Sequence, residues 1–473
     1  MKKLHDYLLT HASKNPISFH MPGHKGAEFY RRFGYENFLN NFMDCDVTEI
    51  PGADNLFQTE GVIKEVQDRY ADLYDVKNSY IQINGTSGGL IAAILASVRP
   101  GKKLIMARNS HKSVFNALTL GNIQPVYAYP EMMEEYGISG EITVLEIQNK
   151  IKENPDADAI ILPSPNYYGI CSDIEGIADI AHKHGKVLIV DQAHGAHLKF
   201  FRKFGIDNFP KSAEESGADI VVNSIHKTLA SYTQSGVLNL NSDRVNQATL
   251  EDKLQAIEST SPSYILMSSL SINADILLKH GREIMQEWSD LVDYTYANAS
   301  SVRDLVLFER TPKLDATKIN FSFSPGNIPG NYIEDYLMDN HNIFIELYTG
   351  NYVMCLTGIG NTQNHVKALL KGLAGVRESV DDNKFAEVKK KKEIKAFGKT
   401  HIYPLPIEKK WHPLMDSAGY ICASSLIPYP PGIPLVCPGE KLTPQIIDYI
   451  KDLRERGEKV IGVNKDYEIL VGA

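Results

Sequence analysis

Cysteine is scarce in this sequence of 473 residues, and the cysteines that are present lie far apart. They occupy positions 45, 171, 355, 422 and 437, so they are odd in number and form no Cys-x-x-Cys pair. That spacing is typical of neither a disulfide framework nor a zinc site. We therefore expect free thiols in a reducing compartment and no bound metal.

Long apolar runs are also missing. No stretch approaches the roughly 18 apolar residues that a membrane span requires. Residues 1–20 mix His, Asp, Lys and Asn with short apolar pairs, which is not the pattern of a signal peptide. We expect a cytoplasmic protein that has no membrane partner.

Positive charge is in the minority. The 49 Lys and Arg residues are outnumbered by 58 Asp and Glu residues, and the net charge of -9 argues against nucleic acid as a partner. Hydrophobic residues make up 43% of the chain and charged residues 23%, which is typical of a globular enzyme. At this length we expect one large domain and one or two smaller domains.

What the sequence does contain is a set of apolar runs that end in reactive side chains. Ile220–Val222 is a β-branched run typical of a buried strand, and Ser224, His226 and Lys227 follow it directly. Ligand sites in open α/β sheets lie at the carboxyl ends of strands. A lysine there can form an imine with an aldehyde if its surroundings favour the neutral amine. The alternative is a surface lysine that caps a strand.

A glycine-rich turn provides a candidate phosphate site. The expected strand Tyr80–Ile83 runs into Asn84–Gly89, and an apolar helix follows. This layout presents backbone N–H groups and a helix dipole to an anion, and Gly85, Thr86 and Ser87 lie at its centre. It is neither a Walker A loop nor a dinucleotide turn, so it indicates a phosphate and not a nucleotide.

Two further strand ends carry polar side chains. His111 follows the strand expected at Lys103–Ala107, and Asp191 directly follows the apolar run Val187–Val190. A buried carboxylate requires a partner. Strands that alternate with helices imply a mainly parallel sheet with right-handed crossovers, which brings these ends to one edge.

Pyridoxal phosphate (PLP) needs a lysine, an anion cup, a carboxylate for its ring nitrogen and a flat group against its ring. The sequence offers one candidate for each need, namely Lys227, Gly85–Ser87, Asp191 and His111. We therefore expect a PLP enzyme.

Six motifs, in order, carry a resemblance that runs from about residue 16 to the end. They are His20–Lys25, Asn84–Gly89, His111–Ser113, Asp191–His197, Ser224–Lys227 and Pro428–Glu440. Together they resemble the Orn/Lys/Arg decarboxylases, the group III PLP-dependent decarboxylases. The resemblance implies decarboxylation of arginine, lysine or ornithine to agmatine, cadaverine or putrescine, through an internal aldimine on Lys227, an external aldimine and a quinonoid. It leaves the choice among the three substrates open.

The resemblance also implies an architecture. It implies an α/β fold of type I, like aspartate aminotransferase, with a large PLP domain whose sheet is mainly parallel and a smaller C-terminal α+β domain. We expect an N-terminal arm at 1–60 that contributes to the active site and dimer contacts, the PLP domain at 61–300 and the C-terminal part at 301–473. It further implies a homodimer with shared active sites, leaves larger assemblies open, and indicates a short form without an N-terminal wing domain.

Residue roles are implied by matching motifs. Lys227 would hold the cofactor, Asp191 would pair with its ring nitrogen, His111 would stack on the ring, and Ala193 and His194 would lie beside it. Thr86 and Ser87 would hold phosphate, Ser224 and His226 would contact phosphate or substrate, and Ser261 would reach the phosphate of the neighbouring subunit.

For the cationic end of the substrate, we expect Glu440 to supply the counter-charge. The proline and glycine turns around it fix its backbone. Asp54 and Glu346 are the other candidates, and a helix cap near Pro444 is the alternative role for Glu440. The chain departs from the family at Gln192, where Glu is usual, and at Asp54–Phe57, where Asp-Asp-Leu-His is frequent.

Two other functions remain open. One is another fold type I activity such as an aminotransferase, which commonly binds the substrate carboxylate with an arginine of the small domain. The region between Glu378 and Leu453 has no arginine, which disfavours it. The other is a non-catalytic PLP-binding protein, which the complete set of Lys227, Asp191 and His111 disfavours.

Overall fold

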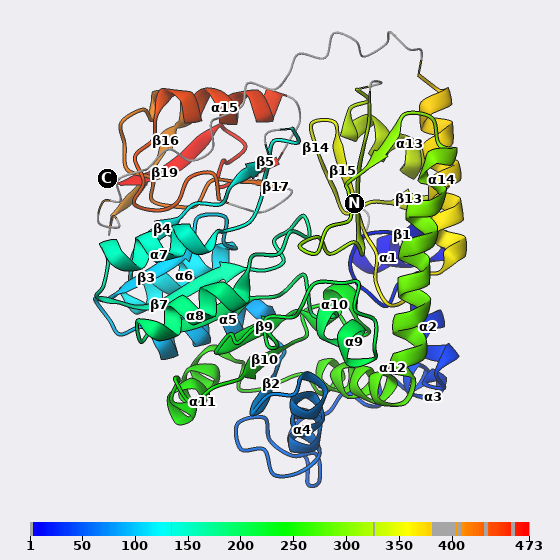
Figure 1. Cartoon of the computed structure of the whole chain (residues 1–473), viewed down its shortest axis with the longest axis horizontal. Helices are drawn as coiled ribbons and strands as arrows, with labels where there is room; N and C mark the ends of the chain where they lie inside the picture. The colour runs from blue at the N-terminus through cyan, green and yellow to red at the C-terminus, as the bar shows by residue number, and fades with distance from the viewer. Residues whose placement is uncertain are drawn as a thin grey trace.

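A seven-stranded sheet forms the centre of the chain. The computed structural model describes residues 3–133, 135–324, 327–380, 403, 406, 408–429, 434–455 and 459–472. In spatial order the strands are β2 (Asn78–Gln82), β10 (Gly236–Leu240), β9 (Ile220–Asn223), β8 (Val187–Asp191), β7 (Ala157–Pro163), β3 (Lys103–Ala107) and β4 (Gln124–Ala128). Only β10 runs against its neighbours in this sheet (Figure 1).

Helices cover both faces of the sheet because its strands point alternate side chains to opposite faces. In β3, Leu104 and Met106 belong to the core on one face, and Ile105 belongs to the core on the other. The first face carries α5 (Gly85–Ser97), α6 (Lys112–Gly121) and α11 (Gln247–Ile257), and the second carries α7 (Val144–Glu153) and α8 (Ile174–Lys183).

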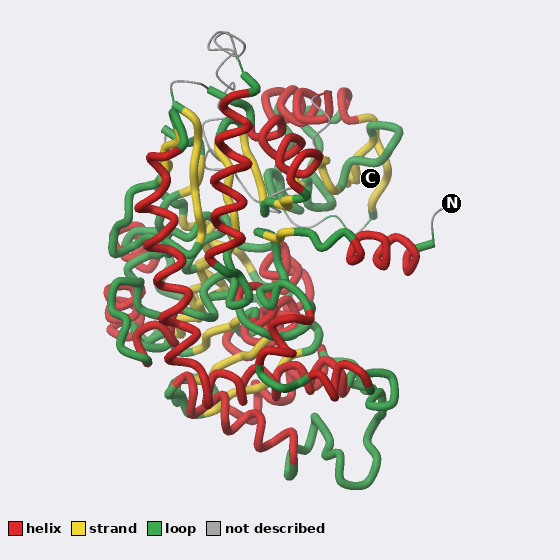
Figure 2. The backbone as a smooth tube through the Cα atoms, turned by 90° about the vertical axis from the view of Figure 1, so that its right-hand side faces the viewer, coloured by secondary structure: helices red, strands yellow, loops and turns green. Residues whose placement is uncertain are grey.

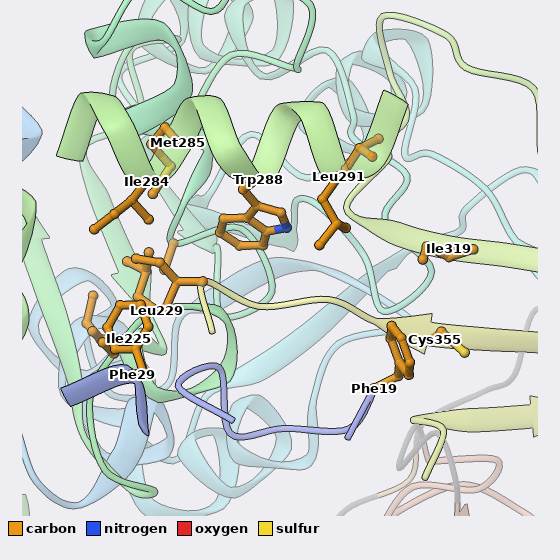
Figure 3. Packing of buried hydrophobic residues seen from close by; sticks show 14 of the residues in the cluster. Phe19, Phe29, Ile225, Leu229, Ile284, Met285, Trp288, Leu291, Ile319 and Cys355 are labelled. Carbon is orange, nitrogen blue, oxygen red and sulfur yellow. The ribbon is translucent and has the colours of Figure 1, made fainter. Parts of the chain in front are cut away.

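A second unit is built on a four-stranded antiparallel sheet. Its strands are β11 (Leu305–Leu307), β12 (Lys318–Phe323), β15 (Tyr352–Leu356) and β14 (Leu347–Thr349), with helices α13 (Gly330–His341) and α14 (Gln363–Glu378). The 35-residue helix α12 (Tyr264–Asn298) joins this unit to the large one. Figure 3 shows its Trp288 and Leu291 above Leu229 of the large unit and Ile319 of β12, in one continuous core.

The N-terminal segment lies against both units. Helix α1 (Leu4–Ser13) buries no residue and projects from the body of the molecule (Figure 2). After it, β1 (Ile17–Ser18) pairs in parallel with β13 (Ile343–Phe344). The loop that follows is hydrogen-bonded to the large unit at Gly23, whose N–H donates to the carbonyl of His226 at 2.8 Å. The short helices α2 (Ala27–Arg32) and α3 (Glu36–Asn40) come next, and α4 (Val62–Tyr74) packs against α12.

The C-terminal region has a core of its own, which includes Leu414, Ile447, Ile450, Val460 and Val471. Its elements are β16 (Lys409–Pro413), β17 (Ile427–Tyr429), α15 (Pro444–Glu455), β18 (Lys459–Ile461) and β19 (Glu468–Gly472). Strands β16 and β19 pair with each other, as do β17 and β18. Residues 430–433, within the Pro428–Glu440 motif, lie outside the described residues.

The predicted fold class is confirmed, since a mainly parallel sheet is accompanied by a smaller α+β part. The mostly apolar run Ile343–Leu347 also predicts a single strand, and this prediction is wrong. It divides into β13 and β14, which join different sheets, and the chain bends at Glu346 between them. The domain boundaries given above stay predictions.

Candidate active site

A cavity of about 340 Å³ lies at the edge of the large sheet where its parallel strands end. The segments that follow β2, β3, β7, β8 and β9 all contribute to its wall, because strands that run in one direction deliver their carboxyl ends to one edge. The wall includes ten of the predicted site residues, namely Gly85, Thr86, Ser87, His111, Asp191, Ala193, His194, Ser224, His226 and Lys227.

Lys227 reaches the cavity from α10 (Ile225–Thr228), a short helix that begins directly after β9 and Ser224. Its Nζ atom lies 2.9 Å from Nε2 of His194. Burial lowers the pKa of Lys227, although the carboxylates of Asp191 and Glu346 oppose this. An amine with a lowered pKa is neutral more often, and the neutral amine is the form that attacks a carbonyl carbon.

Asp191 is the last residue of β8, and 7% of it is exposed. Its Oδ1 atom accepts a hydrogen bond from the N–H of Ala193 at 3.1 Å. Burial raises the pKa of Asp191, while the cation of Lys227 and the Ala193 hydrogen bond oppose the shift. A cationic N–H group inside the cavity would therefore stabilise this carboxylate.

His111 is fixed as the N-cap of α6. Its Nδ1 atom accepts a hydrogen bond from the backbone N–H of Ser113 at 3.3 Å and lies 2.9 Å from the Ser113 hydroxyl. Burial, with a further contribution from the Lys227 cation, lowers the pKa of His111 to about 3. The ring is thus neutral near pH 7 and can lie flat against an aromatic ligand.

The start of α5 forms the anion-binding end of the cavity. Gly85 has a φ of 67°, which lies in the left-handed region that favours glycine. The hydroxyl oxygens of Thr86 and Ser224 lie 2.9 Å apart, and Ser87 joins them in the wall. Hydroxyl groups together with backbone N–H groups at a helix N-terminus are suited to a phosphate.

His226 has a fixed orientation beside this end. Its Nδ1 atom lies 2.8 Å from the carbonyl oxygen of Ser235, so Nδ1 carries the hydrogen and Nε2 remains an acceptor. Burial lowers the pKa of His226 to about 4, although the Ser235 hydrogen bond opposes the shift. The imidazole is therefore neutral near pH 7.

Glu346 borders the cavity through two residues of its wall. The carboxylate accepts hydrogen bonds from the backbone N–H of Met21 at 3.0 Å and from the hydroxyl of Tyr167 at 2.9 Å. Only 1% of its side chain is exposed. This places a buried negative charge directly behind the wall.

Glu440, the predicted counter-charge to the substrate, is paired with a side chain of this protein. Its carboxylate accepts hydrogen bonds from Nε and Nη2 of Arg108 at 3.2 and 3.0 Å and from the N–H of Cys437 at 2.8 Å. Both members of the ion pair are buried, and Glu440 is not part of the cavity wall. Because Arg108 already supplies the counter-charge, the geometry favours a structural role that holds the C-terminal region against the end of β3.

Asp54 and Ser261 are not brought to the cavity. The carboxylate of Asp54 accepts hydrogen bonds from the N–H groups of Gly61, Ile63 and Lys64 and so caps α4. Burial would raise the pKa of Asp54, but backbone N–H donors outweigh it and lower the pKa to about 2. Ser261 is exposed, and its contact with a neighbouring subunit stays a prediction.

Several wall residues were not assigned from the sequence. They are Met21, Asn109, Lys112, Pro163, Pro165, Asn166, Tyr167, Tyr168, Ile427 and Ile461. Met21 lies in the His20–Lys25 motif, and Tyr167 lies in the loop after β7, so both positions carried a signal that could have been used. Ile427 directly precedes the Pro428–Glu440 motif, whereas Ile461 has no distinguishing local pattern.

The cavity suits PLP. Nδ1 of His194 and Oδ1 of Asn109 are buried, and the described part of the chain offers neither a hydrogen-bond partner. The wall combines an amine, a carboxylate, an imidazole and an anion cup, which are the groups that PLP requires.

Among the described residues, no group of three or more His, Cys, Asp or Glu side chains is arranged to bind a metal ion. No helix in the same residues is long and apolar enough to cross a membrane.

Comparison with known proteins identifies the family. A model for the Orn/Lys/Arg decarboxylase major domain matches residues 3–327, and one for the C-terminal domain of the same family matches residues 407–470. An arginine decarboxylase of Bacillus subtilis is 30% identical, and the alignment covers 97% of this chain and 95% of that protein.

Solved structures agree on the fold. A lysine decarboxylase of Francisella novicida matches with a TM-score of 0.76 at 21% identity, over 95% of this chain and 78% of that one. An alanine–glyoxylate aminotransferase of a Nostoc species matches with a TM-score of 0.53 at 15% identity, over 67% and 86%. PLP is the cofactor that this fold and family imply, and it is the cofactor that the cavity suits. The chain belongs to the Orn/Lys/Arg decarboxylase family and is a PLP-dependent amino-acid decarboxylase.

Proposed function

We propose that this enzyme converts arginine to agmatine and CO2. The observation that carries the proposal is the convergence of Lys227, Asp191 and His111 on one cavity, beside the N-terminus of α5. Arginine is chosen over lysine and ornithine because the Bacillus subtilis relative, 30% identical over nearly the whole chain, is an arginine decarboxylase.

Bound PLP supplies a conjugated ring that accepts the electron pair left behind when CO2 departs. The residues that would hold it are Lys227 at its aldehyde carbon, Thr86, Ser87, Ser224 and His226 at its phosphate, His111 on its face, Ala193 and His194 beside it, and Asp191 at its ring nitrogen. Asp191 is buried, and a protonated ring nitrogen beside it would stabilise its carboxylate.

A proton must take the place of the departing carboxylate. Lys227 Nζ and His194 Nε2 lie 2.9 Å apart, which is within the distance for proton transfer. We assign Nζ of Lys227 as the atom that returns this proton to the α-carbon. His194 keeps Nζ directed into the cavity through the same hydrogen bond.

Glu346 is our proposal for the counter-charge to the guanidinium group. Its buried carboxylate lies behind Met21 and Tyr167 and is oriented by both. Each of its oxygens already accepts one hydrogen bond and retains capacity for another. A guanidinium group binds a carboxylate through two parallel N–H donors, which suits this arrangement.

The test supplies carboxyl-labelled arginine, lysine and ornithine to the purified enzyme with PLP. We expect labelled CO2 and agmatine in equal amounts from arginine, and a lower kcat/KM for the other two. A preference for lysine or ornithine would overturn the choice of substrate. Keto acid formed without CO2 would indicate an aminotransferase, and bound PLP without either product would indicate a non-catalytic protein.

The role of Glu346 has its own variant. Glu346→Gln should lower kcat/KM for arginine by roughly ten- to a hundredfold, since a charge-assisted hydrogen bond contributes about 1.5–3 kcal/mol. Asp335→Asn, an exposed acid on α13, is the matched control and should change little. An unchanged kcat/KM in Glu346→Gln would exclude Glu346 from substrate recognition.

A further inference from the structure

A buried polar cluster lies behind the wall of the active site and is not used by the mechanism above. It consists of His197, Thr228, Asp315, Thr317 and Lys318, and each of the five has an exposed fraction of 0%. Trp288 packs on its His197 ring, with ring centroids 4.8 Å apart, and belongs to the core drawn in Figure 3. None of the five lines the cavity.

The centre of the cluster is an ion pair. Lys318 is the first residue of β12, and its Nζ atom lies 2.5 Å from Oδ2 of Asp315. Although burial raises the pKa of Asp315, Lys318 and His197 outweigh this and hold the pKa well below its usual range. The carboxylate is therefore ionised. A buried ion pair contributes little to stability compared with apolar residues of the same size, so its presence calls for another explanation.

One arm of the cluster reaches His194. The ammonium group of Lys318 donates a hydrogen bond to the carbonyl oxygen of His194 at 2.7 Å. His194 is the residue whose Nε2 lies 2.9 Å from Nζ of Lys227. A charged donor thus fixes the backbone from which this imidazole is presented.

The other arm reaches the residue next to Lys227. Nε2 of His197 lies 3.1 Å from Oδ2 of Asp315, and Nδ1 of the same ring lies 3.2 Å from the hydroxyl of Thr228. Thr317 completes this arm, because its hydroxyl donates to Asp315 at 2.7 Å. Both chain segments that meet in the Lys227–His194 contact are therefore anchored to one ion pair at the start of β12.

We propose that Lys318 and Asp315 are positioning residues that set the geometry of the Lys227–His194 pair from the second unit. They act through the carbonyl of His194 and, by way of His197, through Thr228. The proposal rests on the functions assigned above to Lys227 and His194. It predicts that the ion pair affects the cofactor and the turnover number more than it affects the folding of the chain.

The test compares Lys318→Met with a double variant, Lys318→Met/Asp315→Asn, both as holoenzymes. The double variant keeps an amide at position 315 that can form hydrogen bonds to His197 and Thr317. It leaves no unpaired charge in the interior. Three quantities are measured: the Tm, the pH at which the visible absorbance of the bound cofactor changes, and kcat with KM. The absorbance is recorded without substrate, so it remains informative even if arginine is not the substrate.

We expect kcat to fall at least about tenfold in both variants, with KM changed by less than about threefold. We also expect the absorbance transition to move to higher pH in Lys318→Met, because a cation has been removed from beside the site. Recovery of Tm in the double variant without recovery of kcat would identify a positioning role. A folded double variant that no longer binds PLP would support the same conclusion, since neither residue lines the cavity.

Arg377→Met is the matched control. It breaks an ion pair of the same unit, in which Nε of the buried Arg377 donates to the partly buried Asp304 at 2.6 Å. It should lower Tm with no change in the absorbance transition or kcat. The proposal is overturned if the Lys318 variants behave like this control. It is also overturned if neither Lys318 variant folds, because the pair would then serve folding itself.

Discussion

Asp191, at the residue scale, illustrates how the surroundings of one side chain prepare it for its partner. Burial raises its pKa, and the cation of Lys227 and the N–H of Ala193 offset this. A protonated ring nitrogen beside Asp191 would add a second cation that stabilises this carboxylate. The same carboxylate would keep the ring nitrogen protonated throughout the reaction.

Asp191→Asn should therefore still bind PLP but lose most of its decarboxylase activity. An amide cannot stabilise the positive ring nitrogen, and the loss of a charge-assisted interaction worth about 3 kcal/mol corresponds to roughly a hundredfold in kcat. The measurement is kcat beside the visible absorbance of the holoenzyme, with Asp179→Asn, an exposed position on α8, as control. Near-normal turnover would mean that Asp191 has a structural role.

His226 provides a prediction about pH. Its pKa is lowered from 6.5 to about 4 by burial, so between these values the unfolded chain binds a proton that the folded chain does not. The stability of the apoprotein should therefore fall as pH is lowered through this window, by up to about 1.4 kcal/mol per pH unit from this residue. Urea unfolding measures the free energy of unfolding at pH 7 and at pH 5. Between the two, the wild type should lose about 2 kcal/mol more of this free energy than His226→Gln loses. Equal losses of unfolding free energy in the two proteins would contradict the lowered pKa of His226.

The site residues that could be predicted from the sequence are those that directly follow a strand. Lys227, Asp191 and His111 have this position. The local sequence pattern alone therefore predicts that they lie at one edge of a sheet. The partners of Gln192 could not be predicted in this way. Its amide donates to Glu214 at 2.9 Å, so the glutamate that is usual in the family would face a second carboxylate here.

At the scale of elements, the end of β3 and the C-terminal region are joined by the Arg108–Glu440 ion pair. Arg108 also donates hydrogen bonds to the carbonyls of Pro434 and Leu435 at 2.7 and 3.1 Å. The prolines and glycines around Glu440 predict a rigid segment, and this stays a prediction. The sequence could not indicate the partner, because Arg108 lies 332 residues earlier in the chain.

Glu440→Gln should therefore reduce stability and leave substrate selection nearly unchanged. Removing one member of a buried ion pair costs about 3–5 kcal/mol, because the other charge is left without a partner. We expect a lower Tm and faster proteolysis of the C-terminal region, with kcat/KM for arginine changed by less than about threefold. Glu455→Gln, at an exposed position of α15, serves as control. A large fall in kcat/KM with an unchanged Tm would restore the predicted role in substrate recognition.

Strands and helices of the large unit lie close to where the sequence predicts them. The reason is that the spacing of apolar residues differs between a helix and a strand and can be recognised locally. Lys103–Ala107 is a strand with the expected bounds. The near-helical spacing of Val62, Val66 and Leu73 predicts a helix at Gly61–Leu73, and α4 lies there. The separation of β13 from β14 was not foreseen. It depends on the pairing of β13 with β1, more than 300 residues away, and no local pattern in Ile343–Leu347 indicates it.

At the scale of the whole molecule, exposed apolar side chains gather in the N-terminal part of the described chain. They are Leu4, Tyr7, Leu8, Leu9, Phe42, Met43, Ile50 and Val62. Leu4, Tyr7, Leu8 and Leu9 all lie on α1, which projects from the body of the molecule and leaves these side chains accessible to a partner. We propose that residues 1–60 form an arm that packs on a second copy of the chain, and that the domains at 61–300 and 301–473 share each active site across that dimer.

A mixture of two inactive variants tests this proposal. Lys227→Ala lacks the cofactor lysine, and Ser261→Arg blocks the contact that we expect with the neighbouring subunit. After the two are refolded together, about a quarter of wild-type activity should return, because half of the dimers are mixed and one of their two sites is intact. A fully active monomer in sedimentation would exclude shared sites, and absent recovery in proven hybrids would count against them.

The central claim is that Lys227 holds PLP at the edge of the large sheet. The most direct test is reduction of the purified holoenzyme with borohydride, followed by mass spectrometry of its peptides. Reduction fixes the cofactor permanently to the amine that carries it. We predict a yellow protein in which the pyridoxyl group is found on the peptide that contains Lys227, and no such label in Lys227→Ala. A label on any other lysine, Lys25 and Lys318 included, would contradict the account.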